Sequence, residues 1–264
     1  SGGGSGNTFN SSIIFEGSTA DDHETTLQVV DPTQDQTITL GNQSGSVMLW
    51  QSEWPDDPGT QGLYNYPIGY DALANITSGA NYNVAFGKSA AQSLTTADYC
   101  VAVGQAAMMD NATDNYSTVV GYGAGRGAYL TGGTYLGAQA GNYNSSSKDY
   151  QTAVGYNAMN DNWGDYSTAV GYGAMTDGNH YLSVAVGAAS LSRSSTYYPY
   201  YNVCVGYGTG TSIYSGDGNV LLGHNVNTSG TSDQYGVAVG HQSMGTHYGV
   251  AIGYQAQNQV DDGS

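Results

Sequence analysis

Basic residues are almost missing from this chain of 264 residues. Lys88, Arg126, Lys148 and Arg193 are the complete set against 21 acidic residues, so the formal net charge is −17. So few positive charges cannot neutralise a phosphate backbone, which excludes nucleic acid as a partner. The same balance disfavours binding to an anionic membrane surface. Because such a surface repels itself at low salt, the composition favours an extracellular or virion surface in a saline medium.

Long apolar runs and cysteine are also scarce. No apolar run approaches the roughly 18 residues that a membrane-spanning helix needs, so we expect no membrane insertion. Cys100 and Cys204 lie six repeats apart, on the order of 29 Å in a stack of β-coils, which is too far for a disulfide. Cys204 stands where Ala usually stands, and we expect it to be a small buried side chain.

A short cassette, by contrast, returns twelve times. It reads Tyr, a small polar residue, Val or Thr, Ala, and Val or Ile, and it is closed by Gly. The spacing of closing glycines runs from 13 residues (Gly240 to Gly253) to 19 residues (Gly187 to Gly206). Such a period predicts a repeat architecture in which no unit buries its apolar face without neighbours. The closing glycines are Gly69, Gly87, Gly104, Gly121, Gly137, Gly155, Gly171, Gly187, Gly206, Gly223, Gly240 and Gly253.

We therefore predict an all-β fold, a β-solenoid or parallel β-roll of about twelve coils that follows a small β module. The predicted organisation is a flexible tail at 1–8, the β module at 9–50, a connector at 51–62, the repeat array at 63–256 and a tail at 257–264. In the module, turn signals separate β-rich runs at 12–15, 25–30, 36–40 and 45–49. Each coil has room for two strands, one before the closing Gly and one after it.

The strand before the closing Gly is apolar on both faces. Ala holds most of the positions two before Gly, and the position directly before Gly is always apolar. Strands that are apolar on both faces are buried on both. We expect an aliphatic ladder to fill the coil and the Ala face to allow close approach between copies in a symmetric oligomer. The ladder includes Val103, Val120, Val154, Val170, Val186, Val205, Val239 and Ile252.

Tyrosine is the most unusual side chain, with 24 copies concentrated in two slots of the repeat. Equal slots of stacked coils lie above one another, so each slot predicts an aromatic column. The slot five residues before Gly is interpreted as a structural ladder that includes Tyr82, Tyr99, Tyr116, Tyr150 and Tyr166. The slot directly after Gly supplies candidate receptor or glycan contacts at Tyr70, Tyr122, Tyr156, Tyr172, Tyr207 and Tyr254. The competing interpretation of the slot before Gly is an exposed stripe that contacts a receptor, and that of the slot after Gly is packing between coils or against a neighbouring chain.

Other candidate chemistry has less support. Asp or Asn precedes the strand in several coils, as at Asp98 and Asp149, where a column of charges would attract cations. These are also the residues of Asx turns, and we expect neither a metal nor another cofactor. His224 and His241 share the slot after Gly and are expected to stack. No catalytic constellation stands out, so we expect no enzyme, although chance carboxylate pairs leave a polysaccharide depolymerase open.

Two segments resemble known repeats. Residues 167–174 (Ser-Thr-Ala-Val-Gly-Tyr-Gly-Ala) and 249–256 (Gly-Val-Ala-Ile-Gly-Tyr-Gln-Ala) resemble the head repeat of trimeric autotransporter adhesins, the YadA-like family. This resemblance implies a left-handed parallel β-roll assembled as a trimer, and the same repeat occurs in bacteriophage tail fibres. Residues 13–17, 27–33 and 37–40 resemble a module of marine phage fibre proteins. The variable period, with no coiled-coil stalk or membrane anchor, favours the phage fibre over the adhesin.

These observations predict a structural and receptor-binding fibre protein, a bacteriophage tail fibre segment that mediates host attachment from the virion. Its partners would be further copies in a homotrimer, a host-cell surface receptor such as a glycan, and other virion or fibre proteins. Many weak contacts made by three chains would supply avidity. The alternative is a bacterial surface adhesin or an extracellular filament subunit. An ice-binding solenoid is a further alternative, since four consecutive coils place Thr in one slot at Thr118, Thr134, Thr152 and Thr168.

Overall fold

The computed structural model describes residues 12–15, 25–28, 64–77, 79–127, 130–142, 149–162, 164–192 and 197–257. The chain divides into two units, Ser1–Trp50 and Gln51–Ser264. In the first unit, β1 (Ser12–Phe15) pairs antiparallel with β2 (Thr25–Gln28), and both lie within predicted strands. The predicted tail at 1–8, the predicted tail at 257–264 apart from Gln257, the connector at 51–62 and the predicted strands at 36–40 and 45–49 fall outside the described residues.

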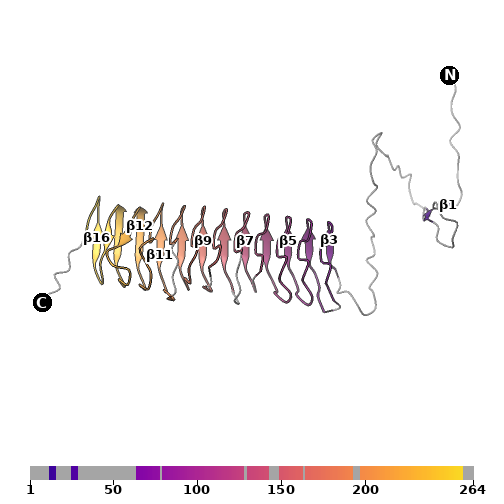
Figure 1. The fold of residues 1–264 in the computed structure, drawn as a ribbon, viewed down its shortest axis with the longest axis horizontal. Helices are drawn as coiled ribbons and strands as arrows, with labels where there is room; N and C mark the ends of the chain where they lie inside the picture. Colours follow the sequence, from indigo (N-terminus) through magenta and orange to yellow (C-terminus); the bar gives the residue numbers. More distant parts are fainter. Residues whose placement is uncertain are drawn as a thin grey trace, which may run out of the picture. The chain divides into compact units, whose positions relative to one another are not determined.

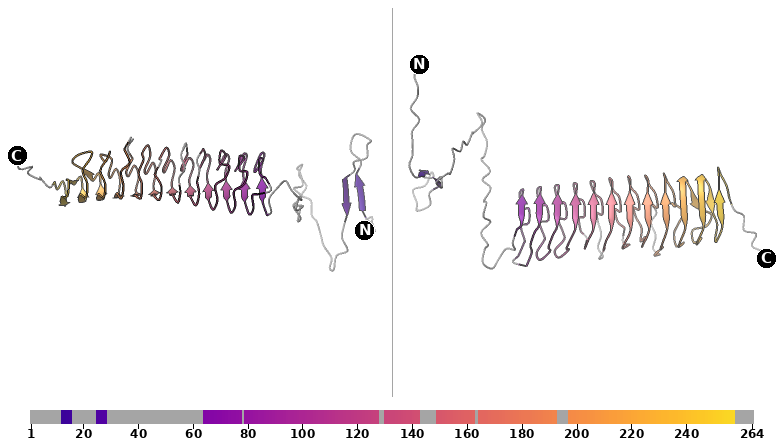
Figure 2. Two further views of the ribbon diagram at one scale, coloured as in Figure 1. Left: turned by 90° about the horizontal axis from the view of Figure 1, so that it is seen from below. Right: turned by 180° about the vertical axis from the view of Figure 1, so that it is seen from behind.

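The second unit is a β-solenoid with a twelve-stranded parallel sheet along one side (Figures 1 and 2). Each turn supplies one strand, and neighbouring strands come from consecutive turns, which confirms the predicted all-β solenoid. The described residues contain no helix. The strands are β3 (Tyr66–Ile68), β4 (Val84–Phe86), β5 (Val101–Val103), β6 (Thr118–Val120), β7 (Thr134–Leu136), β8 (Thr152–Val154), β9 (Thr168–Val170), β10 (Val184–Val186), β11 (Val203–Val205), β12 (Val220–His224), β14 (Val237–His241) and β16 (Val250–Ile252).

The register between strands places equal positions of the repeat opposite one another. Thr152 of β8 pairs with Thr168 of β9, and Val154 pairs with Val170. The closing glycines form their own column, with φ between 126° and 140°. A Cβ atom on Gly155 would lie 2.5 Å from the carbonyl oxygen of Gly171, which no side chain can tolerate. Glycine is therefore required where each turn leaves the sheet.

The two faces of the strand are the reverse of the predicted arrangement. Ala153, Ala169 and Ala185 at the strand centres point into the coil and are fully buried. The aliphatic ladder points outward, so the prediction that it fills the coil is wrong, as is the outward placement of Ala. In the single chain, Val103, Val154, Val186 and Val239 are half-buried, while Val120, Val170, Val205 and Ile252 are exposed.

The limb after the closing Gly also differs from the prediction of a second strand. Among the described residues, only β13 (Asn227–Thr228) and β15 (Met244–Gly245) pair as a second parallel sheet. In most turns the residues two and four after Gly have positive φ, as Asn157 and Met159 do. This limb keeps hydrogen bonds between turns, since the Met159 amide donates to the Ala174 carbonyl (2.9 Å). Residues with positive and negative φ alternate along this limb, whereas a β-strand has negative φ throughout. Its side chains therefore do not alternate between two faces as those of a strand do.

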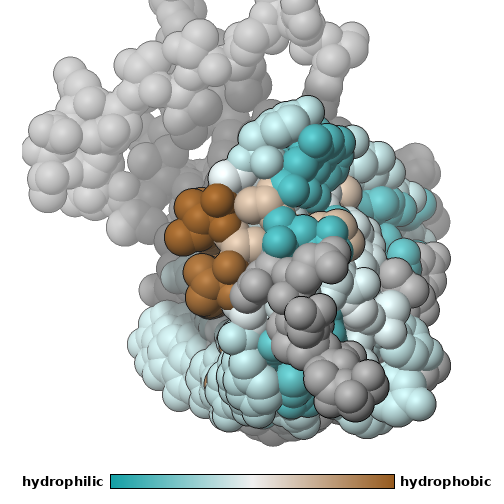
Figure 3. Space-filling view, turned by 90° about the vertical axis from the view of Figure 1, so that its left-hand side faces the viewer, coloured by the Kyte–Doolittle hydropathy of each residue, from teal (hydrophilic) through white to brown (hydrophobic). Residues whose placement is uncertain are grey.

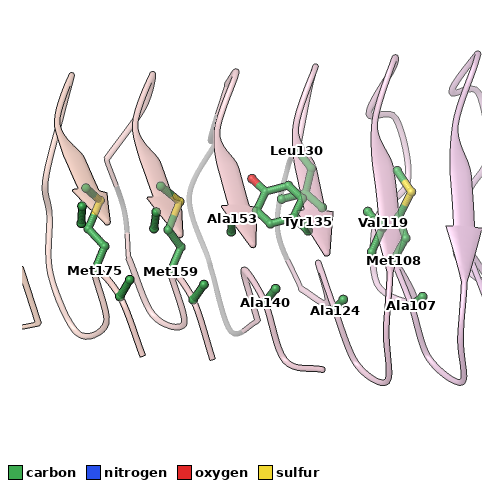
Figure 4. Close-up of a cluster of buried hydrophobic side chains, with 14 of the residues drawn as sticks. Ala107, Met108, Val119, Ala124, Leu130, Tyr135, Ala140, Ala153, Met159 and Met175 are labelled. Atoms are coloured by element: carbon green, nitrogen blue, oxygen red, sulfur yellow. The ribbon is translucent and has the colours of Figure 1, made fainter. Parts of the chain in front are cut away.

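The core runs between the two limbs as a file in which Ala predominates and longer apolar side chains fill the remaining space (Figure 4). In a typical turn the strand contributes Ala, and the opposite limb contributes Ala three residues after Gly and a longer residue four after it. Met108, Met159, Met175 and Leu191 fill that last position and are fully buried. The limbs lie so close that a long side chain from one requires a short side chain from the other. This is the physical reason that Ala, and not Val, faces inward.

In most turns a buried polar side chain occupies the position four residues before the closing Gly. Asn83 donates through Nδ2 to Asn65 Oδ1 (2.9 Å) and to the Ala97 carbonyl (2.7 Å). Its own Oδ1 accepts a hydrogen bond from the Cys100 amide (2.9 Å). These bonds satisfy backbone groups at the bend where the turn enters the sheet. The bend can therefore be buried without leaving polar groups unpaired.

Candidate interaction surface

The outward side of the twelve-stranded sheet, which we call the outer face, is uncharged and largely apolar. Its central columns are the residues three and one before each closing Gly, and no charged residue occurs in either column. Phe86 is 54% exposed and Ile252 is 70% exposed. Seen from the carboxyl-terminal end, hydrophobic residues gather on one side of the array (Figure 3). A continuous apolar surface along a whole domain marks an interaction site.

The tyrosine ladder five residues before the closing Gly borders the outer face on one side. Tyr64, Tyr82, Tyr99 and Tyr116 form one stack with ring centroids 5.0, 5.0 and 5.4 Å apart. In the later turns, Tyr150 stacks on Tyr166 (5.3 Å). These rings are about half exposed, so they pack along the rod and still present aromatic surface to solvent.

The backbone of this ladder is left-handed in every turn. Nine tyrosines occupy the slot with φ between 53° and 60°, and Leu182, Gly132 and Gly218 fill the other three turns with φ of 50°, 69° and 68°. A left-handed residue other than glycine costs about 1–2 kcal/mol. Each stacked pair returns about 0.5–1.5 kcal/mol, which offsets this strain where neighbouring turns both carry Tyr.

The slot directly after the closing Gly borders the outer face on the other side. All six candidate contacts are exposed there, namely Tyr70, Tyr122, Tyr156, Tyr172, Tyr207 and Tyr254. Tyr156 stacks on Tyr172 (5.6 Å), and the Lys88 ammonium lies 6.0 Å from the ring centroid of Tyr70.

The predicted stacking of His224 on His241 is confirmed, with centroids 4.8 Å apart and an interplanar angle of 2°. Tyr207 stacks on His224 (5.2 Å) and Tyr254 on His241 (5.4 Å), which makes a four-ring column near the carboxyl-terminal end.

Aspartates that precede the strand bind the backbone of neighbouring turns. Asp98 Oδ1 accepts a hydrogen bond from the Asn81 amide (2.6 Å), and Asp217 Oδ1 accepts one from the Tyr200 amide (2.7 Å). These carboxylates therefore act as structural acceptors between turns. In the part of the chain that the structure describes, no group of three or more His, Cys, Asp or Glu is placed to hold a metal ion.

Both cysteines are free and buried, and Cys204 is the small core residue that the sequence predicts. The Cys100 thiol donates to the Asp114 carbonyl (2.8 Å). Burial, with a further contribution from the charges of Asp114 and Asp98, raises the pKa of Cys100 to about 11. The reactive thiolate is therefore scarce at neutral pH, and Cys100 is a poor nucleophile.

A hollow on the limb after the closing Gly was not predicted from the sequence. It has a volume of about 390 Å³ and lies across three consecutive turns, with Tyr172, Asp161 and Asp177 in its lining. The spacing of the two carboxylates, one turn apart in the same slot, is the signal that could have located it.

No family model, curated protein or solved structure matches the chain. The geometry therefore carries the functional argument. The fold defines a β-solenoid protein, an architecture compatible with a fibre-like or adhesin-like structural protein. None of the described segments is a helix of the length and apolarity needed to cross a membrane.

Proposed function

We propose that this protein is a segment of an attachment fibre, built from three identical chains that cover one another's outer faces. The observation that carries the proposal is the uncharged outer face of a chain whose net charge is −17. Copies with this charge repel each other, so they associate most easily through a surface that carries none. Burial of a long apolar face supplies the favourable free energy.

A further copy of the chain fits this face better than an unrelated partner. The outer face repeats at the spacing of neighbouring strands, about 4.8 Å, and only a partner with the same repeat matches it along the whole array. Closed cyclic symmetry completes such an assembly without open edges. The number three comes from the resemblance to the YadA-like head repeat.

The proposed setting is the tail fibre of a bacteriophage, where a stiff rod carries receptor contacts away from the virion. Exposed tyrosine columns would meet the host-cell receptor, and three chains would make many weak contacts at once. The same geometry serves a bacterial surface adhesin or an extracellular filament subunit, and the surrounding genes would separate these alternatives.

Sedimentation velocity tests the assembly. We expect the chain to sediment as a species of three times 27.4 kDa, about 82 kDa. Val170→Asp combined with Val186→Asp places charges on the outer face and is expected to yield monomers with an unchanged circular dichroism spectrum. Ala74→Asp adds a charge at an exposed position outside the outer face and should leave the assembly intact. A stable wild-type monomer would contradict the proposal.

Ice binding is a second candidate function that one observation favours. Thr118, Thr134, Thr152 and Thr168 lie in register on four neighbouring strands of the outer face. A trimer would bury this column, so the sedimentation result and a measurement of thermal hysteresis decide between the two functions. Hysteresis from a monomer, reduced by Thr134→Val and Thr152→Val, would favour ice binding.

A further inference from the structure

We infer that the hollow after β9, which we call the Tyr172 groove, binds a neutral saccharide. This inference rests on the proposed attachment function and assigns it a ligand class and a site. The volume of about 390 Å³ falls in the range of small-ligand pockets, about 300–1,000 Å³. The groove combines an aromatic wall with side chains that donate and accept hydrogen bonds, as recognition of a polyol requires.

Tyr172 provides the aromatic wall. Its side chain is 65% exposed, and one face of its ring stacks on Tyr156 (5.6 Å, interplanar angle 16°). The same slot of the following turn holds Ala188, so the column of aromatic rings ends at Tyr172. Gly173 and Ala189 beside it add no bulk to the groove. The second ring face is therefore open to the C–H face of a sugar, which packs on aromatic rings.

Polar groups from consecutive turns stand beside this wall. Asp177 is exposed, and its carboxylate can accept hydrogen bonds from two neighbouring sugar hydroxyls. Asn160 Nδ2 donates to Asn157 Oδ1 (3.3 Å), which leaves further amide donors for a ligand. Thr176 Oγ1 and Ser192 Oγ lie 2.6 Å apart and orient each other. The groove thus offers both acceptors and donors at fixed spacing.

The charge of the groove selects against acidic sugars. Asp161 and Asp177 line it, and none of the lining residues that the structure describes is basic. A sugar carboxylate would face like charges here, in a chain of net charge −17. Asp177 lies six residues after the closing Gly171 and outside the outer face, so copies packed on that face leave the polar side of the groove open.

Tyr122 offers a matched control in the same slot of another turn. Like Tyr172 it is exposed, is followed by Gly and has Ala, here Ala138, in the slot of the next turn. Gly127 stands where Asp177 would be, and Arg126 forms an ion pair with Asp110 (3.0 Å). The aromatic platform is present at this turn without the Asp177 acceptor, and Asp110, in the slot of Asp161, is paired with Arg126.

The test uses the full chain on an array of neutral, amino and acidic oligosaccharides in buffer with EDTA. The best neutral oligosaccharide is then titrated by calorimetry. We expect Tyr172→Ala to weaken binding about tenfold, while Tyr172→Phe retains it because the ring face persists. Asp177→Asn is expected to weaken binding severalfold, and Tyr122→Ala to leave it within twofold. Circular dichroism spectra of all variants confirm the fold.

Three results would overturn the inference: no neutral oligosaccharide binds, acidic oligosaccharides bind equally well, or Tyr122→Ala weakens binding as much as Tyr172→Ala. Sedimentation of the same samples separates this inference from the proposed fibre. If the chain forms a trimer but binds no saccharide, only the inference about the groove is contradicted. If the chain is a monomer that binds saccharide through Tyr172, the proposed fibre is contradicted and the inference about the groove is supported.

Discussion

The ring of Tyr135 fills the space that Gly141 leaves open in the same turn. A Cβ atom on Gly141 would overlap the tyrosine ring. The Tyr135 hydroxyl, fully buried, donates to Gln151 Oε1 (2.9 Å). In the next turn Ala153 takes the place of Tyr135 and Met159 the place of Gly141. Core volume is therefore balanced between these two positions in several turns, and the same exchange recurs in the pairs Val119 with Gly125 and Cys204 with Gly210.

This balance predicts strong coupling between the two positions. Tyr135→Ala alone should cost about 3–5 kcal/mol, because it leaves a cavity. Gly141→Met alone should be destabilising, because Met and the ring compete for one space. The double variant reproduces the Ala153 and Met159 arrangement, and Met159 already adopts a φ of 52°.

We expect the double variant to recover most of the stability that the two single variants lose in sum. It should remain about 2–3 kcal/mol below wild type, because Met at position 141 takes a left-handed φ of 61° and the hydrogen bond at Gln151 is lost. Urea denaturation midpoints of the four proteins measure the coupling. Additive losses in the double variant would contradict the balanced core.

The closing glycines predict a contrast between two Gly→Ala variants. Gly155→Ala brings a Cβ atom into the Gly171 carbonyl at a φ of 128°, and should cost more than about 4 kcal/mol. Gly123 has a φ of 59° and open space around it. In the same slot of another turn, Ala106 already adopts a φ of 56°. Gly123→Ala should cost only about 1–2 kcal/mol. Thermal unfolding measures both, and equal losses would refute the role of the glycine column.

The left-handed backbone of the tyrosine ladder predicts that Tyr99→Gly is more stable than Tyr99→Ala, the reverse of the usual order in a strand. Both Tyr99→Ala and Tyr99→Gly lose two stacked pairs, at a cost of about 1–3 kcal/mol. Ala keeps the left-handed strain at φ 58°, whereas Gly removes it, so the Gly variant should be more stable by about 1 kcal/mol. At Thr152, in a strand, the order should be the ordinary one, with Ala above Gly. Denaturation midpoints compare the pairs, and the same order at both sites would count against ladder strain.

Asp114 predicts a pH dependence of stability. Its side chain is 2% exposed, and Oδ2 has no hydrogen-bond partner. Burial, with a contribution from the charge of Asp149, raises the pKa of Asp114 from 3.8 to about 6. The folded chain therefore holds the proton more tightly than the unfolded chain does. The stabilisation from Asp114 is complete below about pH 4 and is lost as the pH rises to about 6.

Asp114→Asn should remove this part of the pH dependence and be more stable than wild type at pH 7. Melting temperatures between pH 3.5 and 7.5 test the prediction. Asp177→Asn, which changes an exposed carboxylate, should keep the wild-type slope between pH 4 and 6. If Asp114→Asn kept that slope as well, another group would be responsible.

Features that depend on the repeat itself could be predicted from the sequence. The cassette and its closing Gly specify the register, so the stack of His224 on His241 and the column of Tyr82 on Tyr99 follow from equal slots. The Tyr172 groove could not be predicted in this way. The groove depends on the distances of Asp177 and Ser192, which lie on different turns, from the ring of Tyr172. Spacing along the sequence does not determine those distances.

By itself, the amino-acid order determined that this chain stacks parallel strands in register, because the same short pattern with its closing Gly returns in every turn. Only the tertiary structure decided which side of each strand faces inward. Both sides are apolar, so hydrophobicity could not choose between Ala169 and Val170. The distance between the two limbs decides it. The buried side chain of Met175 fills most of the space between them, so only the methyl group of Ala169 fits inside.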